Sequence, residues 1–219
     1  MKTIYFNPGC ALSIYKPEME HRLLKYIKNE VYPNAKMHNI CCRHNPKIEE
    51  GSTIINICAG CDRRFGTLYE GIDTMSFWEV LDQTNAFPYP DYNGQKMTVH
   101  DACPIRGKPQ IHTAIRSLLH KMNIQIIETE RQGTRSVCCG DNFYPKYPIS
   151  QVHQKMKSRA DSMPCENVAV YCVSCIKAMF IGGKSPRYMI DLLFNEETNA
   201  GVYDTAQWHK QLQTYIDAH

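Results

Sequence analysis

Short runs of apolar residues alternate along the chain with longer stretches in which apolar residues recur at helical spacing. The short runs predict buried strands at 3–6, 53–57, 97–100, 124–127 and 168–171, and a weaker one at 36–40. The longer stretches predict helices at 17–31, 111–122 and 149–163, and a short helix at 62–69. Strands that alternate with helices are typical of parallel sheets, so the pattern predicts an α/β protein.

Cysteines occur twice in one order: a single cysteine, then an adjacent pair, then a C-x-x-C. The first set is Cys10, Cys41, Cys42, Cys58 and Cys61, and the second set is Cys103, Cys138, Cys139, Cys172 and Cys175. Of the eleven cysteines, Cys165 alone has no counterpart. Each set follows the expected strands, whose carboxyl ends meet at one edge of a parallel sheet. We therefore expect each set to converge at such an edge.

The expected elements around the cysteines also repeat, which predicts a tandem pair of domains. The halves differ between the pair and the C-x-x-C, because 140–171 is about twice as long as 43–57 and holds the extra helix at 149–163. A linker is predicted at Asn85–Gly94, which contains Pro88 and Pro90. The expected domains are 1–94 and 95–219, two small Rossmann-like domains related by a pseudo-twofold. The second ends in a helix capped by Asp204, with apolar residues on one face: Trp208, Leu212 and Ile216.

Composition narrows the classes of protein to which the chain can belong. The 219 residues are 43% hydrophobic and 21% charged, which is typical of a globular protein. The net charge of +3 is spread without blocks, which does not favour nucleic-acid binding. No apolar run approaches the ~18 residues of a membrane span, and the N-terminus does not read as a signal peptide. A cytoplasmic protein is expected, in which reduced cysteines indicate metal binding or redox chemistry.

The cysteine spacing favours iron–sulfur chemistry over zinc. A C-x-x-C directs both sulfurs to one ion, whereas an adjacent pair diverges and suits two centres of a cluster. Five soft ligands in each set also exceed the four that structural zinc takes. The alternatives are buried thiols that act only as small apolar side chains, a structural zinc site, and zinc in one half with a cluster in the other.

The doubled pattern C-(x)n-C-C-G-(x)n-C-x-x-C resembles the cysteine-rich CCG domains found in the B-type subunit of heterodisulfide reductase over nearly the whole chain. Related domains occur in iron–sulfur subunits of glycolate and lactate oxidases and in an unusual succinate dehydrogenase subunit. Gly140 completes the motif after the second pair, whereas Arg43 follows the first.

This resemblance implies two noncubane [4Fe-4S] clusters, each with a vacant edge at which a substrate disulfide binds. The implied cluster ligands in the first half are Cys10, Cys41, Cys42, Cys58 and Cys61. Those in the second half are Cys103, Cys138, Cys139, Cys172 and Cys175. Ferredoxin-type cysteine runs are absent from the sequence, so a separate redox partner is expected, either ferredoxin-like or a flavoprotein subunit.

Other polar residues lie near the cysteines in sequence. His100 and Asp101, or His44, are candidates to donate a proton or a hydrogen bond to a cluster sulfur, with bonding to backbone as the alternative. Basic residues near the expected edges are candidates to bind an acidic substrate, to offset cluster charge or to form a solvated rim: Arg43, Arg63, Arg64, Arg106 and Lys108. Glycines beside the cysteines predict close backbone approach or ordinary turns: Gly9, Gly60, Gly107 and Gly140.

Three functional hypotheses follow. The first is an iron–sulfur oxidoreductase, or the catalytic subunit of one, that carries two [4Fe-4S] clusters and reduces a disulfide or similar small substrate. The second is a non-catalytic electron-transfer or zinc-stabilised subunit of a flavin-dependent dehydrogenase complex. The third is a thiol redox sensor that uses the C-x-x-C pairs directly. Neither G-x-G-x-x-G nor a P-loop occurs, so any organic cofactor is expected on a partner.

Overall fold

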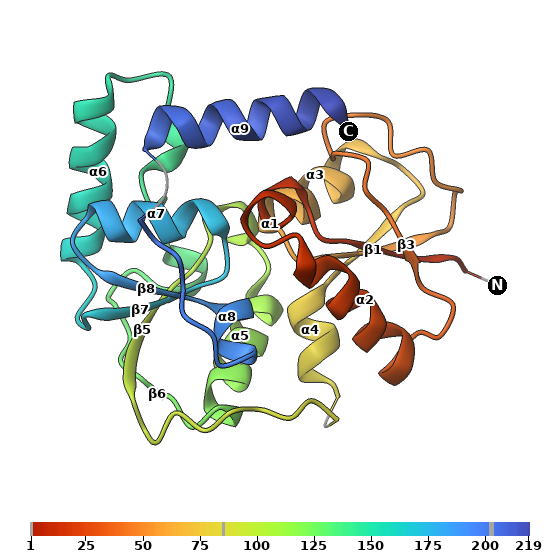
Figure 1. Ribbon diagram of the computed structural model, residues 1–219, viewed down its shortest axis with the longest axis horizontal. Coiled ribbons are helices and arrows are strands. Elements are labelled where there is room, and N and C mark those ends of the chain that lie inside the picture. The colour runs from red at the N-terminus through yellow and green to blue at the C-terminus, as the bar shows by residue number, and fades with distance from the viewer. Residues whose placement is uncertain (1, 85, 202–203) are drawn as a thin grey trace. The chain divides into compact units, whose positions relative to one another are not determined.

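The computed structural model describes residues 2–84, 86–201 and 204–219. The chain divides into two compact units, Met1–Phe87 with His209–His219, and Pro88–Trp208. Each unit contains one four-stranded sheet in which every strand pair is parallel (Figure 1). The predicted α/β class with two parallel sheets is confirmed.

The domain boundary at Gly94 stays a prediction about independently folding segments. The compact units themselves separate between Phe87 and Pro88. Asn85, the first residue of the expected linker, lies outside the described residues, and 86–94 contains neither a helix nor a strand.

The first unit orders its strands β2-β1-β3-β4. These strands are β1 (Ile4–Asn7), β2 (Lys36–Met37), β3 (Thr53–Asn56) and β4 (Asp73–Ser76). The helices of this unit are α1 (Cys10–Tyr15), α2 (Glu18–Glu30), α3 (Ala59–Leu68) and α4 (Phe77–Asp82).

The second unit repeats this topology, with the order β6-β5-β7-β8. Its strands are β5 (Lys96–His100), β6 (Gln125–Ile126), β7 (Asn167–Val170) and β8 (Ser185–Tyr188). Its helices are α5 (Pro109–Lys121), α6 (Ile149–Asp161), α7 (Val173–Ile181) and α8 (Met189–Leu193). The described part of this unit also contains single-turn 3₁₀ helices, namely η1 (Cys103–Ile105), η2 (Gly133–Arg135) and η3 (Asp141–Phe143).

Equivalent strands pair in equivalent register, which makes residues of the two units directly comparable. Asn7 at the end of β1 lies opposite Asn56, and His100 at the end of β5 lies opposite Val170. His100 therefore occupies in the second unit the place of Asn7 in the first, three residues before the single cysteine in each case.

The apolar pattern predicted the central strands because they are buried on both faces. Ile54 and Ile55 in β3 are wholly buried, as are Val168 and Val170 in β7. Fully burying one such side chain stabilises the fold by about 1.5–3 kcal/mol. The edge strands β4 and β8 were not predicted, because the sequences DTMS and SPRY mix polar and partly exposed positions. The strand expected at 36–40 is only the two-residue β2.

Two helices begin at or beside cysteines, which the sequence did not predict. Cys10 is the first residue of α1, a helix that is absent from the predicted elements. The helix expected from Asp62 begins at Ala59, with Cys58 as its N-cap residue. Cys61 therefore lies in the first turn of α3, so the C-x-x-C of the first unit joins a strand end to a helix start.

The last helix is α9 (Thr205–Ala218). As expected, Asp204 caps it, with its Oδ1 accepting the backbone N–H of Gln207 at 2.6 Å. Trp208 and Ile216 are buried, and Leu212 is half-buried. Among the described residues, no helix has both the length and the apolar character needed to cross a membrane.

Candidate metal centres

Strand order explains why the cysteines meet. In the first unit, the chain leaves β1 toward β2 and returns to form β3 on the other side of β1. The loops after β1 and β3 therefore diverge and open a crevice at their carboxyl ends, the usual ligand position in an open parallel sheet. Cys10 directly follows the first loop, and Cys58 directly precedes α3. The second unit has the same crossover between β5 and β7.

The five thiols of the first set form one continuous string of sulfur contacts. Hydrogen bonds join Cys10 to Cys41, Cys41 to Cys42, Cys42 to Cys61, and Cys61 to Cys58. The string lies against a buried cluster that includes Ile54, Phe65 and Ile216. The structure therefore brings together all five cysteines that the sequence grouped.

The second set forms a string with the same connectivity. Hydrogen bonds join Cys103 to Cys138, Cys138 to Cys139, Cys139 to Cys175, and Cys175 to Cys172. Each set thus runs from the single cysteine through the pair to the second and then the first sulfur of the C-x-x-C. All eleven cysteines are free thiols, so no disulfide competes with these contacts.

The string determines which sulfur holds negative charge. Hydrogen bonds donated by Cys10 and Cys103 lower the pKa of Cys41 and Cys138 to about 2. The same bonds raise the pKa values of Cys10 and Cys103 themselves. In each set the pKa of the first cysteine of the pair is thus lowered, and the pKa values of its two neighbours in the string are raised. In the first set, hydrogen bonds also lower the pKa of Cys58, to about 7. Since metal ligands must be deprotonated, binding of a metal releases the remaining protons.

The spread of each string suits a group of several metal atoms better than one ion. Four sulfurs around one zinc ion at about 2.3 Å lie less than about 4 Å apart. Among the described residues, one group of three donor atoms lies within 4.8 Å of one another, namely the Sγ atoms of Cys139 and Cys175 with a ring nitrogen of His100. No three cysteines of the first set meet this limit in that part of the chain. Five soft sulfurs in a string fit an iron–sulfur cluster.

Gly140 and Arg43, which follow the two cysteine pairs, occupy different surroundings. Gly140 has a left-handed φ of 112°, and a Cβ there would lie 2.7 Å from the backbone nitrogen of Met156 in α6. Its N–H donates to the Cys138 Sγ at 3.4 Å. The first unit has no helix within 43–52, so no backbone of that kind approaches its pair. The absence of α6 there removes the need for glycine, which explains why Arg43 is accommodated.

Gly9 makes the second close approach. Its φ is 78°, and a Cβ would lie 2.9 Å from the Cβ of Cys58. The sequence also placed Gly107 among such positions, but a Cβ at Gly107 would meet nothing within 4 Å. Gly107 therefore belongs to an ordinary turn.

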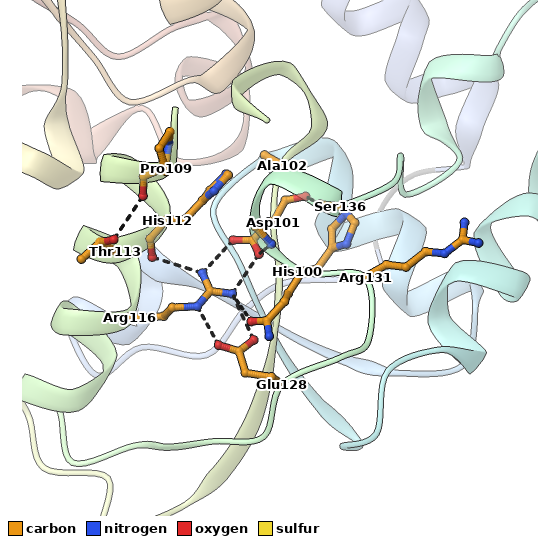
Figure 2. A network of polar contacts seen from close by, with 12 residues as sticks. His100, Asp101, Ala102, Pro109, His112, Thr113, Arg116, Glu128, Arg131 and Ser136 are labelled. Atoms are coloured by element: carbon orange, nitrogen blue, oxygen red, sulfur yellow. Dashed lines mark hydrogen bonds and ion pairs between the residues drawn. The ribbon is translucent and has the colours of Figure 1, made fainter. Parts of the chain in front are cut away.

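An ion pair joins Arg116 to Asp101, which lies two residues before Cys103 in the chain (Figure 2). The Asp101 carboxylate is fully buried and accepts two hydrogen bonds from the guanidinium of Arg116, at 3.0 and 2.9 Å. It also accepts the Gly133 N–H at 2.6 Å and the Tyr171 hydroxyl at 3.1 Å. Burial alone would raise the pKa of Asp101, but the Arg116 fork and charge, with the Gly133 N–H, hold it below its ordinary value. Asp101 is thus a structural anion that fixes the loop, and its side chain is not available to donate a proton.

His100 is held as a neutral ring beside the second set. Arg159 donates from Nε to the His100 Nδ1 at 3.2 Å, and a guanidinium can only donate. Nδ1 is therefore an acceptor, and the ring proton is on Nε2. Burial, together with the nearby Arg159 charge, lowers the pKa of His100 to about 3. The Nε2 atom is buried and has no hydrogen-bond partner among the described residues, so its N–H is free to donate to a group bound at the second set.

The equivalent position in the first unit has a different role. Asn7 donates from Nδ2 to the Nδ1 of His38 at 3.2 Å, and the Nε2 of His38 donates to the Pro46 carbonyl at 2.9 Å. His38 thereby fixes the short loop that follows the first pair.

The other candidates from the sequence mostly hold backbone. His44 donates from Nε2 to the carbonyl of Ile216 at 2.8 Å, as in the backbone alternative. Arg64 donates to the Cys42 carbonyl at 3.2 Å, and Arg106 to the Ser136 carbonyl. A solvated position is found for Arg43 and Arg63, which are exposed, while Lys108 is half-buried.

Two arginines, Arg116, which is half-buried, and Arg159, which is buried, were not predicted from the sequence. Arg116 and Arg159 lie on helices α5 and α6, where basic residues are ordinary. The available signal was the extra helix of the second half, since Arg159 lies on it and donates to Arg131 and Ser162 besides His100.

The chain has a distant relative among known reductases. No protein family model matches the chain. Over 200 residues, the chain is 22% identical to the B subunit of fumarate reductase (CoM/CoB) from Methanothermobacter marburgensis. The chain is similar to a reductase subunit. The alignment covers 78% of this chain but 40% of that protein, so the chain spans less than half the length of the relative.

Proposed function

We propose that the chain is an iron–sulfur redox subunit of the heterodisulfide reductase B type, which carries two [4Fe-4S] clusters of the noncubane kind. The observation that carries the proposal is the identical string of five thiols in each unit. Cys10, Cys41, Cys42, Cys58 and Cys61 hold the first cluster. Cys103, Cys138, Cys139, Cys172 and Cys175 hold the second.

The proposed reaction reduces a disulfide or a similar small substrate. Two electrons and two protons convert one disulfide bond into two thiols, and the electrons come from a separate ferredoxin-like or flavoprotein partner. The bound clusters supply the one-electron steps and the metal sites at which sulfur binds. The chain's own residues hold the clusters and tune them, because the buried charge of Arg159 and the N–H of His100 lie beside the second set.

The similarity to a reductase subunit supports the expectation of partner subunits. A cytoplasmic location belongs to the same proposal, because a reducing compartment keeps free thiols available for metal.

The alternative is a non-catalytic electron-transfer or zinc-stabilised subunit of a flavin-dependent dehydrogenase complex. The shorter first unit favours it in part, since the loop between its pair and its C-x-x-C lacks the counterpart of α6. Zinc in one half would leave a single cluster in the chain. This alternative differs from the main proposal in metal content and is therefore directly measurable.

The test is the iron, zinc and acid-labile sulfide content of full-length protein prepared anaerobically. Two clusters predict about eight irons with matching sulfide, whereas one cluster predicts about four, with or without one zinc. The variant Cys138→Ser should lose the iron of the second set, and Cys165→Ser is the matched control because Cys165 belongs to neither string. Protein that stays colourless and EPR-silent after reconstitution with iron and sulfide would refute the proposal.

A further inference from the structure

A cavity of about 650 Å³ opens beside the second cysteine set. Cys138 is among the residues that line it. Helix α6 contributes most of the others: Gln151, Gln154, Lys155, Ser158 and Arg159. The cavity therefore reaches the first sulfur of the second cysteine pair.

The lining is cationic. Arg131, Lys155 and Arg159 contribute positive charge, and none of the residues that line the cavity carries a carboxylate. Arg159 is committed to His100 and to two further partners. Lys155 has no carboxylate partner among the residues that the structure describes. Its ammonium instead lies 4.5 Å from the ring centre of Phe143 and 5.2 Å from that of Tyr147. Two aromatic rings thus hold an unneutralised cation at the cavity.

The wall of this cavity is the element in which the two halves differ. Helix α6 comes from the longer segment of the second half, and 43–52 of the first unit forms no helix. Holding the cysteines does not require α6, because the first string forms without it. The extra helix therefore has a use beyond building the thiol string, and its polar face supplies most of the cavity wall.

We propose that this cavity binds a small organic anion, with its charged group at Lys155 and Arg131 and its other end at Cys138. This inference rests on the proposed function, because the anion is taken to be the substrate of the proposed reductase. It names the substrate class as anionic and assigns substrate entry to the second unit. Polar glutamine and serine side chains on α6 complete the site with neutral hydrogen-bonding groups. An uncharged molecule of the same size gains no charge interaction there.

The test measures alkylation of Cys138 in full-length, metal-free protein by iodoacetate and by iodoacetamide. The two reagents are close in size but differ in charge, so the ratio of their rates reports anion attraction at the cavity. Peptide mass spectrometry reads the rate at Cys138, and the rate at Cys165 in the same sample normalises for reagent reactivity. The Lys155→Met variant should lower the iodoacetate-to-iodoacetamide ratio at Cys138 roughly three- to tenfold at low salt.

Lys157→Met is the matched control. Lys157 lies on the same helix and pairs with Asp161 at 3.3 Å, but it does not line the cavity. Each variant removes one positive charge, so both change the net charge of the protein equally. A drop with Lys155→Met and none with Lys157→Met supports the site. Equal drops in the rate ratio for the two variants would indicate a general charge effect. No drop in either variant would indicate that the cavity does not attract anions. Either result overturns the inference. Because the protein is metal-free, the outcome is independent of whether clusters form, which the iron analysis decides.

Discussion

The ion pair between Asp101 and Arg116 gives the sharpest test of the structure. Replacing Arg116 by Met keeps most of the side-chain length but removes the fork on a carboxylate that is fully buried. Asp101 would keep only the Gly133 N–H and the Tyr171 hydroxyl. Removing one partner of a buried pair costs about 3–5 kcal/mol. For a unit of this size, such a loss lowers the melting temperature by at least roughly 10 °C.

The cost should depend on pH in a defined direction. In the native protein, the pKa of Asp101 is depressed, so this group stabilises the fold above its unfolded pKa of about 3.9, and the contribution is lost as pH falls through the folded pKa. In Arg116→Met, burial dominates and raises the pKa of Asp101, so stability is lost as pH rises. The difference in unfolding free energy between the native protein and Arg116→Met should therefore be larger at pH 7 than at pH 4.

Urea denaturation followed by circular dichroism at both pH values measures this difference. The control is Glu128→Gln, because Glu128 also pairs with Arg116 but is about one-third exposed, and such pairs contribute about 0–1 kcal/mol. If Arg116→Met destabilised the protein no more than Glu128→Gln at pH 7, the buried pair would not have the role assigned to it.

Two further predictions concern the second cysteine set. Gly140→Ala should destabilise the protein by roughly 1–3 kcal/mol and reduce the iron bound at the second set, because a Cβ would meet the backbone of Met156. Urea denaturation measures the first effect and iron analysis the second. Arg43→Gly, at the matched position of the first unit, should change both quantities little. Arg159→Met should lower the reduction potential of the second cluster by roughly 30–100 mV in an EPR-monitored titration, because a buried positive charge favours the reduced state. An unchanged potential would contradict that role for Arg159.

The meeting of the cysteines was predictable, because each follows an apolar run that reads as a strand and parallel strands end at one edge. The extra helix of the second half was also predictable from the greater length of 140–171. The reason why glycine is needed at position 140 could not be predicted. It is the close approach of the Met156 backbone, which only tertiary packing determines.

The contacts of the charged groups around the second set could not be predicted from the apolar periodicity or the cysteine spacing. Asp101 and Arg116 are fifteen positions apart and lie on different elements, and no local periodicity joins them. Arg159 reads as one basic residue among several on an amphipathic helix, yet it is only 4% exposed. Burial of a cation depends on partners supplied by other segments, here His100 and the carbonyl of Arg131.

The separation of the sulfurs along the chain bears on how each string is assembled. Each string draws on three loops that whole crossover connections divide, so the sulfurs meet only after the parallel sheet has closed. Formation of each string therefore depends on pairing of strands that lie far apart in sequence. A substitution that weakens the pairing of β1 with β3, or of β5 with β7, would separate the sulfurs without changing any cysteine.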